Sequence, residues 1–235
     1  MIKNPVVFIA SDAVMNDNLD EIEQELVKRD IKVIRGPETR VEGKYVYEPK
    51  DYERLFSEAD VLMFTTKSIC DEKIIKACKK AKGIIVPTIG METIDLEVAT
   101  AHNIITGNGA IPENVLSVAE FTIGLIIMLS AQITKSIDGM KDGKYEKPLK
   151  KVSFSHMLCG RKVGFVGFGK IAQAVAERLQ CFGVELLAYS PSLTQEKAPS
   201  YVKACSLEEV LSESDFVGIY VVINKNTFNM INKET

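Results

Sequence analysis

The chain has 235 residues, of which 46% are hydrophobic and 26% charged, and its formal net charge is −3. This composition is typical of a globular protein with room for one large or two modest domains. The 29 basic and 32 acidic residues are spread along the chain without a basic block, which argues against a nucleic-acid-binding surface.

The N-terminus carries no visible signal peptide, since residues 1–5 lead directly into a short apolar run. The five cysteines show no C-x-x-C spacing, so we interpret them as reduced thiols in a cytoplasmic protein and predict no metal site. The longest uncharged apolar stretch, residues 121–134, is too short to span a bilayer, and it suits a helix in a core or against a partner subunit. We therefore expect a soluble protein without a membrane partner.

Short apolar runs alternate with helical patterns over the first part of the chain. Strands are predicted at residues 6–10, 31–34, 61–65 and 83–87. The helical patterns place apolar residues on one face, with Ile22, Leu26 and Val27 in the first helix and Ile74, Ile75 and Cys78 in one that Asp71 caps. Strands that alternate with helices predict an α/β fold with a parallel sheet covered on both faces.

The pattern changes after about residue 105. A loop at residues 106–115 is followed by a long helical segment to about residue 140 and by a charged connector at 141–151. A second alternating run then predicts a strand at 162–167, a helix at 169–181, a strand at 184–189, a short element at 201–204, a helix at 206–212 and a strand at 215–222. We place one domain at residues 1–105 and a second at 106–235.

A glycine-spaced turn joins the first strand and helix of the second domain. The sequence GFGKIA provides Gly167, Gly169 and Ala172 in the G-x-G-x-x-A spacing. The first glycine would allow the tight turn, the second would let the backbone approach a pyrophosphate, and the alanine would keep helix and strand close. The N–H groups at the helix start would then hold the phosphate charge. Because the strand, the helix and the next strand are all in place, we favour a dinucleotide site over a purely structural turn.

The residue that follows the second strand does not decide which dinucleotide binds. An NAD site usually presents an acidic residue there, about 20 residues past the glycines, whereas this chain has Ser190. Serine can bind a ribose hydroxyl and does not repel a 2′-phosphate, but no arginine follows it, and Lys197 is the nearest cation. Both NAD and NADP stay open.

Three stretches in order resemble the D-isomer-specific 2-hydroxyacid dehydrogenase family. Residues 160–191, with the glycine turn, are similar to the family's cofactor-binding domain, and residues 207–232 to its next helix, strand and adenine-side loop. Residues 90–121 are similar to the stretch that joins the family's two domains and end in its Val-Ala-Glu signature at 118–120. The resemblance covers most of residues 60–235.

The resemblance implies a flavodoxin-like substrate domain beside a Rossmann domain, with the active site in the cleft. It implies a homodimer built on a helix and arm at about residues 114–155, and a small 2-hydroxy or 2-oxo acid as substrate. It also implies that the cofactor-binding residues are Gly167, Phe168, Gly169, Lys170, Ile171, Ser190, Val221, Val222 and Thr227, and that the substrate carboxylate is held by Ile89 and Gly90. Thr88, where the family commonly has glycine, could narrow the approach of the substrate.

The family's catalytic arginine, histidine and glutamate lie beyond the segment that corresponds to residue 235, so we assign no catalytic residue. We expect the chain's two histidines, His102 and His156, to be ordinary surface or capping residues and not the proton donor, and Arg161 and Arg178 match no catalytic position of the family. The strand at 215–222 would form an edge of an incomplete Rossmann sheet. Either the chain is a shortened version of a longer enzyme, which we favour, or a partner covers the edge.

Two functions follow from these expectations. The first is an NAD(P)-dependent oxidoreductase that transfers a hydride between nicotinamide and a 2-hydroxy or 2-oxo acid, with this chain inactive by itself. The alternative is a non-catalytic dinucleotide-sensing protein of the co-repressor type.

Overall fold

The computed structural model describes residues 4–38, 40–143, 155–224 and 226–235. The chain divides into two compact units, residues 1–110 and 111–235. Strand β7 (Ile105–Asn108) pairs with β6 (Gly83–Val86) in the first unit, so this strand lies across the boundary expected at residue 105.

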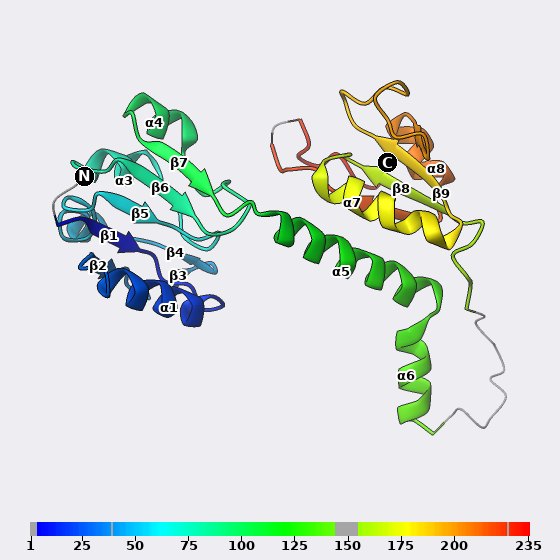
Figure 1. The fold of residues 1–235 in the computed structure, drawn as a ribbon, viewed down its shortest axis with the longest axis horizontal. Helices are drawn as coiled ribbons and strands as arrows, with labels where there is room; N and C mark the ends of the chain where they lie inside the picture. Colours follow the sequence, from blue (N-terminus) through cyan, green and yellow to red (C-terminus); the bar gives the residue numbers. More distant parts are fainter. Residues whose placement is uncertain (1–3, 39, 144–154, 225) are drawn as a thin grey trace. The chain divides into compact units, whose positions relative to one another are not determined.

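The first unit is built on a five-stranded parallel sheet (Figure 1). Its other strands are β1 (Val6–Ile9), β2 (Lys32–Arg35) and β5 (Val61–Met63), and the order along the sheet is β2-β1-β5-β6-β7. Counted along the chain, this is the 2-1-3-4-5 order of flavodoxin-like folds. The expected α/β fold with a flavodoxin-like first domain is confirmed.

Short helices connect these strands. They are α1 (Asn16–Val27), η1 (Pro49–Asp51), α2 (Tyr52–Phe56), α3 (Glu72–Ala77) and α4 (Leu96–Ala101). The Asp71 carboxylate accepts a hydrogen bond from the Ile74 N–H and caps α3, as predicted. In α1, however, Val27 is 56% exposed, and Leu19 is buried instead. Val27 follows Leu26 by one residue, about 100° further round the helix, which turns it away from the sheet.

Aromatic side chains fill the core of the first unit. Phe8 of β1 packs edge-on against Phe56 and Tyr47, with ring centroids 4.8 and 5.7 Å away. Tyr47 follows a small antiparallel hairpin, β3 (Arg40–Val41) and β4 (Lys44–Tyr45), which the sequence pattern did not predict.

The second unit contains a four-stranded parallel sheet in the order β10-β9-β8-β11. Its strands are β8 (Lys162–Val166), β9 (Glu185–Tyr189), β10 (Val202–Ala204) and β11 (Phe216–Ile219). Counted along this unit, the order is 3-2-1-4, which matches the first four strands of the Rossmann order and places β11 at an edge, as predicted. Helix α7 (Lys170–Leu179), the short η2 (Gln180–Phe182) and α8 (Leu207–Glu213) connect the strands.

Both sheets use an aspartate to fasten the start of their first strand. In the first unit, Asp60 accepts a hydrogen bond from the Val6 N–H at 2.9 Å and donates its own N–H to the Val6 carbonyl at 2.8 Å. In the second unit, Asp215 makes the same two bonds with Lys162, each at 2.9 Å. Each aspartate stands just before the strand that completes the pairing of the first strand.

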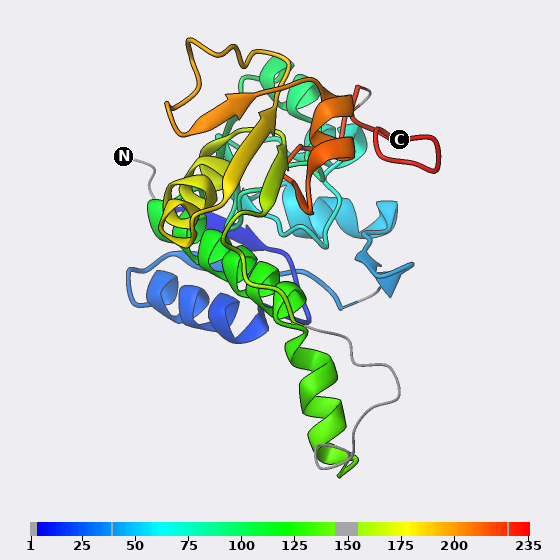
Figure 2. The same ribbon diagram turned by 90° about the vertical axis from the view of Figure 1, so that its right-hand side faces the viewer.

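A long helix, α5 (Pro112–Ser130), opens the second unit and runs beside α7 (Figures 1 and 2). Ala119 and Ile126 face the core of the unit, while Phe121 and Leu129 are 69% and 67% exposed. The helix has 19 residues because it begins well before residue 121. Within the described parts of the chain it is the one helix long and apolar enough to cross a membrane, judged by length and composition alone.

The long helical segment expected to reach residue 140 is interrupted. Gln132 adopts a left-handed conformation with φ 51°, and α6 (Ile133–Lys141) starts after it. The break coincides with a contact from far along the chain, because His156 donates its N–H to the Ser130 carbonyl and accepts from the Ser130 hydroxyl at its own carbonyl. Residues 144–154 of the expected dimerisation arm lie outside the described residues.

Candidate functional site

The turn after β8 has a shape that only glycine allows at its first position. Gly167 has a φ of 89°, a conformation that L-residues avoid. A Cβ atom there would lie 2.9 Å from Val221 Cγ1 and 3.0 Å from the Tyr220 carbonyl oxygen. Gly167 also donates its N–H to the Tyr189 carbonyl at 2.7 Å, which brings the ends of β8 and β9 together.

Gly169 lies under a different constraint. It is the N-cap of α7, with an ordinary extended backbone (φ −85°, ψ −168°), and a Cβ atom added to it would meet nothing within 4 Å. The first N–H groups of an α-helix have no partner inside the helix. In α3, α4 and α8 the side chains of Asp71, Asp95 and Ser206 accept from such groups, whereas α7, like α1, α2, α5 and α6, has no side-chain cap. The start of α7 therefore presents uncapped donors beside open space, which is the arrangement that binds an anion.

The side chains of the three other predicted cofactor-binding residues of the turn differ in how far they are buried. The Phe168 side chain is buried against Phe165, with ring centroids 5.8 Å apart, so only its backbone is available to a ligand. Lys170 is the exposed first residue of α7, and Ile171 packs partly into the core. Ala172 is fully buried, as expected for the position where helix and strand touch.

Gln173 is a residue of this turn that the motif did not indicate. Its side-chain Nε2 donates to the Phe168 carbonyl at 3.1 Å and so ties the glycine turn to the first turn of α7. A polar side chain one turn past the glycines was the available signal, but the motif leaves that position open.

Ser190 directly follows β9 and lies next to the glycine turn through the Gly167–Tyr189 bond. It is half-buried, and its carbonyl accepts the Leu193 N–H at 3.0 Å. Together Gly167 and Ser190 stand at the carboxyl ends of β8 and β9, where ligands bind in open parallel sheets.

The predicted adenine-side residues lie in the segment after β11. Val221 packs against Gly167 from this side, while the Val222 side chain is largely exposed. Thr227 is occupied inside its own loop, because its hydroxyl donates to the Val222 carbonyl and accepts the Asn224 N–H at 2.9 Å. Thr227 thus shapes this loop, whatever else its side chain binds.

The predicted substrate residues, Ile89 and Gly90, follow β6 in the first unit. The Ile89 carbonyl accepts from the Asn108 side-chain amide at 2.8 Å, which fixes the loop against the end of β7. The Glu92 carboxylate reaches over Gly90, since a Cβ atom on that glycine would collide with Glu92 Oε2. The Thr88 hydroxyl is buried and has no hydrogen-bond partner among the described residues.

Each histidine is held at the end of a helix. His102 caps the end of α4, and its Nδ1 lies 2.9 Å from the Val98 carbonyl of the same helix. His156 is exposed in the segment held to Ser130 at the end of α5. Among the described residues, no cluster of three or more His, Cys, Asp or Glu side chains could hold a metal.

A cavity of about 470 Å³ opens elsewhere on the second unit. It is lined by the first residues of the strands, including Lys162 and Glu185, at the amino ends of the sheet. The glycine turn stands at the opposite, carboxyl ends, so this cavity is separate from the candidate site. The N–H donors suited to an anion lie at the glycine turn and not in this cavity.

Comparisons with known proteins agree with this geometry. Residues 123–235 match the family described as D-isomer specific 2-hydroxyacid dehydrogenase, NAD binding domain. A hydroxypyruvate reductase of Thermotoga maritima is 31% identical over 223 residues, which cover 94% of this chain and 68% of that protein. A D-3-phosphoglycerate dehydrogenase of Mycobacterium tuberculosis is 30% identical over 200 residues, 83% of this chain and 37% of that protein.

Solved structures share the fold. An NAD-dependent formate dehydrogenase from Staphylococcus aureus in complex with NAD aligns with a TM-score of 0.79 at 24% identity, over 98% of this chain and 69% of that one. A D-lactate dehydrogenase from Aquifex aeolicus complexed with NAD and lactic acid aligns with a TM-score of 0.78 at 23% identity, over 97% of this chain and 64% of that one.

Proposed function

This chain belongs to the D-isomer specific 2-hydroxyacid dehydrogenase family, and from that premise we propose that residues 167–172 bind the pyrophosphate of NAD or NADP. The bound nicotinamide would exchange a hydride with a small 2-hydroxy or 2-oxo acid. The chain's own contribution is to hold and orient the dinucleotide on the backbone of the glycine turn and on the start of α7.

The observation that carries this proposal is the open space at Gly169. Among the described residues nothing requires a glycine there, because the backbone is extended and an added Cβ atom would meet no neighbour. Serine would be a better N-cap for α7, since its hydroxyl accepts from the first-turn N–H groups. A glycine at this place is explained by a ligand that approaches the backbone closely.

The substitution Gly169→Ser tests the proposal. We expect this variant to keep or slightly raise the melting temperature, since it adds a cap to α7, and to bind NADH and NADPH at least about tenfold more weakly, as measured by cofactor fluorescence. The matched control is Gly139→Ser in α6, where an added Cβ atom also meets nothing and cofactor binding is expected to stay unchanged. If Gly169→Ser bound both cofactors as the unchanged chain does, the turn would be structural only.

We propose the oxidoreductase reaction for the whole protein and not for this chain alone. The chain spans 68% of the Thermotoga relative and 37% of the mycobacterial one. Its two histidines, His102 and His156, cap a helix and hold a segment to α5, and among the described residues neither side chain is paired with a carboxylate. Ready reduction of hydroxypyruvate or glyoxylate by the 235-residue chain would contradict this proposal.

We also propose that the exposed side of α5 is covered by a second copy of the chain. The opposite side of the helix packs against α7, with Ala119 and Ile126 in the core of the unit. The exposed side carries Phe121, Leu125 and Leu129, and Gly124 lies among them with no neighbour of its own. A mid-helix glycine costs about 1 kcal/mol relative to alanine, and close approach of a partner would account for it.

We propose a cytoplasmic location. All five cysteines are free thiols, and Cys159 and Cys181 are exposed, which suits a reducing compartment. Fractionation of cells that produce the protein would test this location.

A further inference from the structure

The turn after β9 brings a free hydroxyl next to the proposed dinucleotide site. Gly167 donates to the Tyr189 carbonyl, so the residue that follows, Ser190, starts beside the glycine turn. The bond from the Leu193 N–H to the Ser190 carbonyl folds the chain back at once. The Ser190 side chain is half-buried and makes no hydrogen bond to any described residue.

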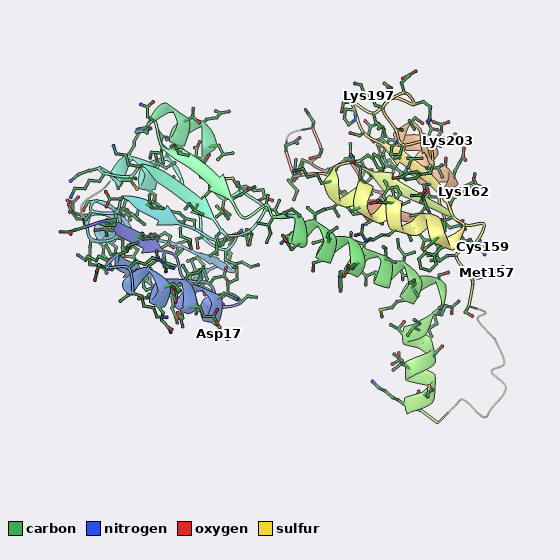
Figure 3. The ribbon with its side chains drawn as sticks, viewed as in Figure 1. Asp17, Met157, Cys159, Lys162, Lys197 and Lys203 are labelled. Atoms are coloured by element: carbon green, nitrogen blue, oxygen red, sulfur yellow. The ribbon has the colours of Figure 1, made fainter. Side chains whose placement is uncertain are left out.

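The loop between β9 and β10 carries a lysine, Lys197, that contacts this turn. Lys197 is exposed, and its Nζ donates to the Ser192 carbonyl at 3.5 Å, so the ammonium group contacts the turn of residues 190–193 at Ser192. The bonds of Lys197 and Ala198 N–H groups to the Thr194 carbonyl, each 3.0 Å long, fix the backbone that carries this lysine. Figure 3 shows Lys197 on the loop between β9 and β10, away from Lys203.

The one carboxylate between residues 190 and 200 is held elsewhere. Glu196 receives a hydrogen bond from the Thr194 side chain, and this bond, together with its own backbone N–H, lowers the pKa of the Glu196 carboxyl. The Glu196 carboxylate is therefore engaged by residues 194–196.

Ser190 and Lys197 bear on the one chemical difference between NAD and NADP, the 2′-phosphate. A carboxylate at the end of the second strand binds the ribose 2′-hydroxyl of NAD and repels a 2′-phosphate, whereas hydroxyl donors and a cation bind the phosphate. From the Ser190 hydroxyl and the returning Lys197 we infer that this chain prefers NADP(H) to NAD(H), with Lys197 and Ser190 binding the 2′-phosphate. The inference rests on the proposed function, because it concerns the same site.

The test compares the dissociation constants of NADPH and NADH for the full chain, by cofactor fluorescence at low ionic strength. We expect NADPH to bind about tenfold more tightly than NADH, and the difference to shrink as salt screens the charge pair. Lys197→Ala should weaken NADPH about fivefold and leave NADH unchanged, while Lys197→Arg should retain the preference. Ser190→Asp should reverse it.

The matched control is Lys203→Ala. Lys203 lies on β10, and its charge acts on Glu209 and Glu213 of α8, so both cofactors should bind this variant as they bind the unchanged chain. Equal or tighter binding of NADH would overturn the inference and leave the proposed function standing. An NADPH preference that survives Lys197→Ala would overturn the role of Lys197. Loss of both cofactors from the unchanged chain would overturn the proposed function and the inference with it.

Discussion

The Asp215 carboxylate accepts a hydrogen bond from the Lys162 backbone N–H at 2.9 Å and so fastens the start of β8 to the start of β11. Arg161 Nη1 lies 2.9 Å from the same carboxylate. The bond to Lys162, assisted by Arg161, lowers the pKa of the Asp215 carboxyl. The stabilisation is therefore complete above the ordinary aspartate pKa of about 3.9 and is lost as the pH falls through the lowered folded-state value.

The variant Asp215→Asn should lack this pH dependence. Between about pH 5 and pH 3 the urea midpoint of the unchanged chain should fall further than that of the variant, since both share every other carboxylate. At pH 7 the variant should be the less stable of the two. Parallel pH profiles would show that the bond does not contribute to stability.

Alanine at position 167 should destabilise the second unit strongly. Gly167→Ala combines a positive φ with contacts of 2.9–3.0 Å to Val221 and Tyr220, so we expect a loss of about 2–4 kcal/mol in urea unfolding. The control is Gly143→Ala, where φ is also positive (63°) but an added Cβ atom meets nothing, and a loss of about 1 kcal/mol is expected. Equal losses would mean that the segment after β11 yields to the new methyl group.

Charges on the exposed side of α5 should separate the proposed dimer. Phe121→Glu and Leu129→Glu should each shift the mass measured by light scattering from dimer to monomer while the helical circular dichroism is kept. Val41→Glu, a change at a side chain 55% exposed on the β3–β4 hairpin, is the control and should leave the mass unchanged. A monomeric unchanged chain would remove the proposed dimer.

Four of the five thiols should react in two groups. Burial raises the pKa of Cys78 to about 12 and raises that of Cys70 as well, whereas Cys159 and Cys181 are exposed. Because the thiolate is the reactive form, iodoacetamide at pH 8 should modify Cys159 and Cys181 first and leave Cys70 and Cys78 unmodified until urea unfolds the chain. Peptide mass spectrometry gives the order. Early modification of Cys70 or Cys78 would show that the first unit opens readily.

The sequence pattern was sufficient wherever local residues determine the structure. The strand, glycine turn and helix around Gly167 follow from an apolar run, glycine spacing and helical periodicity, and β8 and α7 lie within a few residues of the expected ranges. The Asp71 cap of α3 was predictable for the same reason, since a cap depends on neighbours in sequence.

Long-range contacts explain what the pattern did not predict. The residues around Gln132 include no typical helix breaker. The Ser130 carbonyl, however, accepts the N–H of His156, which lies 26 residues later in the chain, and the Ser130 hydroxyl donates to the His156 carbonyl. In the candidate site, Ser190 and Lys197 were visible in the sequence, but the contact of Lys197 with the turn after β9 depends on how the loop folds back. Thr227 likewise looked available for a ligand, while the folded loop engages its hydroxyl.

The paired bonds of Asp60 and Asp215 bear on how the chain assembles as it is made. The hydrogen-bond partner of Val6, Asp60, is made 54 residues later in the chain, and that of Lys162, Asp215, is made 53 residues later. Until the ribosome has released those aspartates and the strands after them, β1 and β8 can pair on one side only, and their other edges stay open to wrong partners. We therefore expect slower translation just after residues 60 and 215 to lengthen the time that each nascent sheet remains exposed.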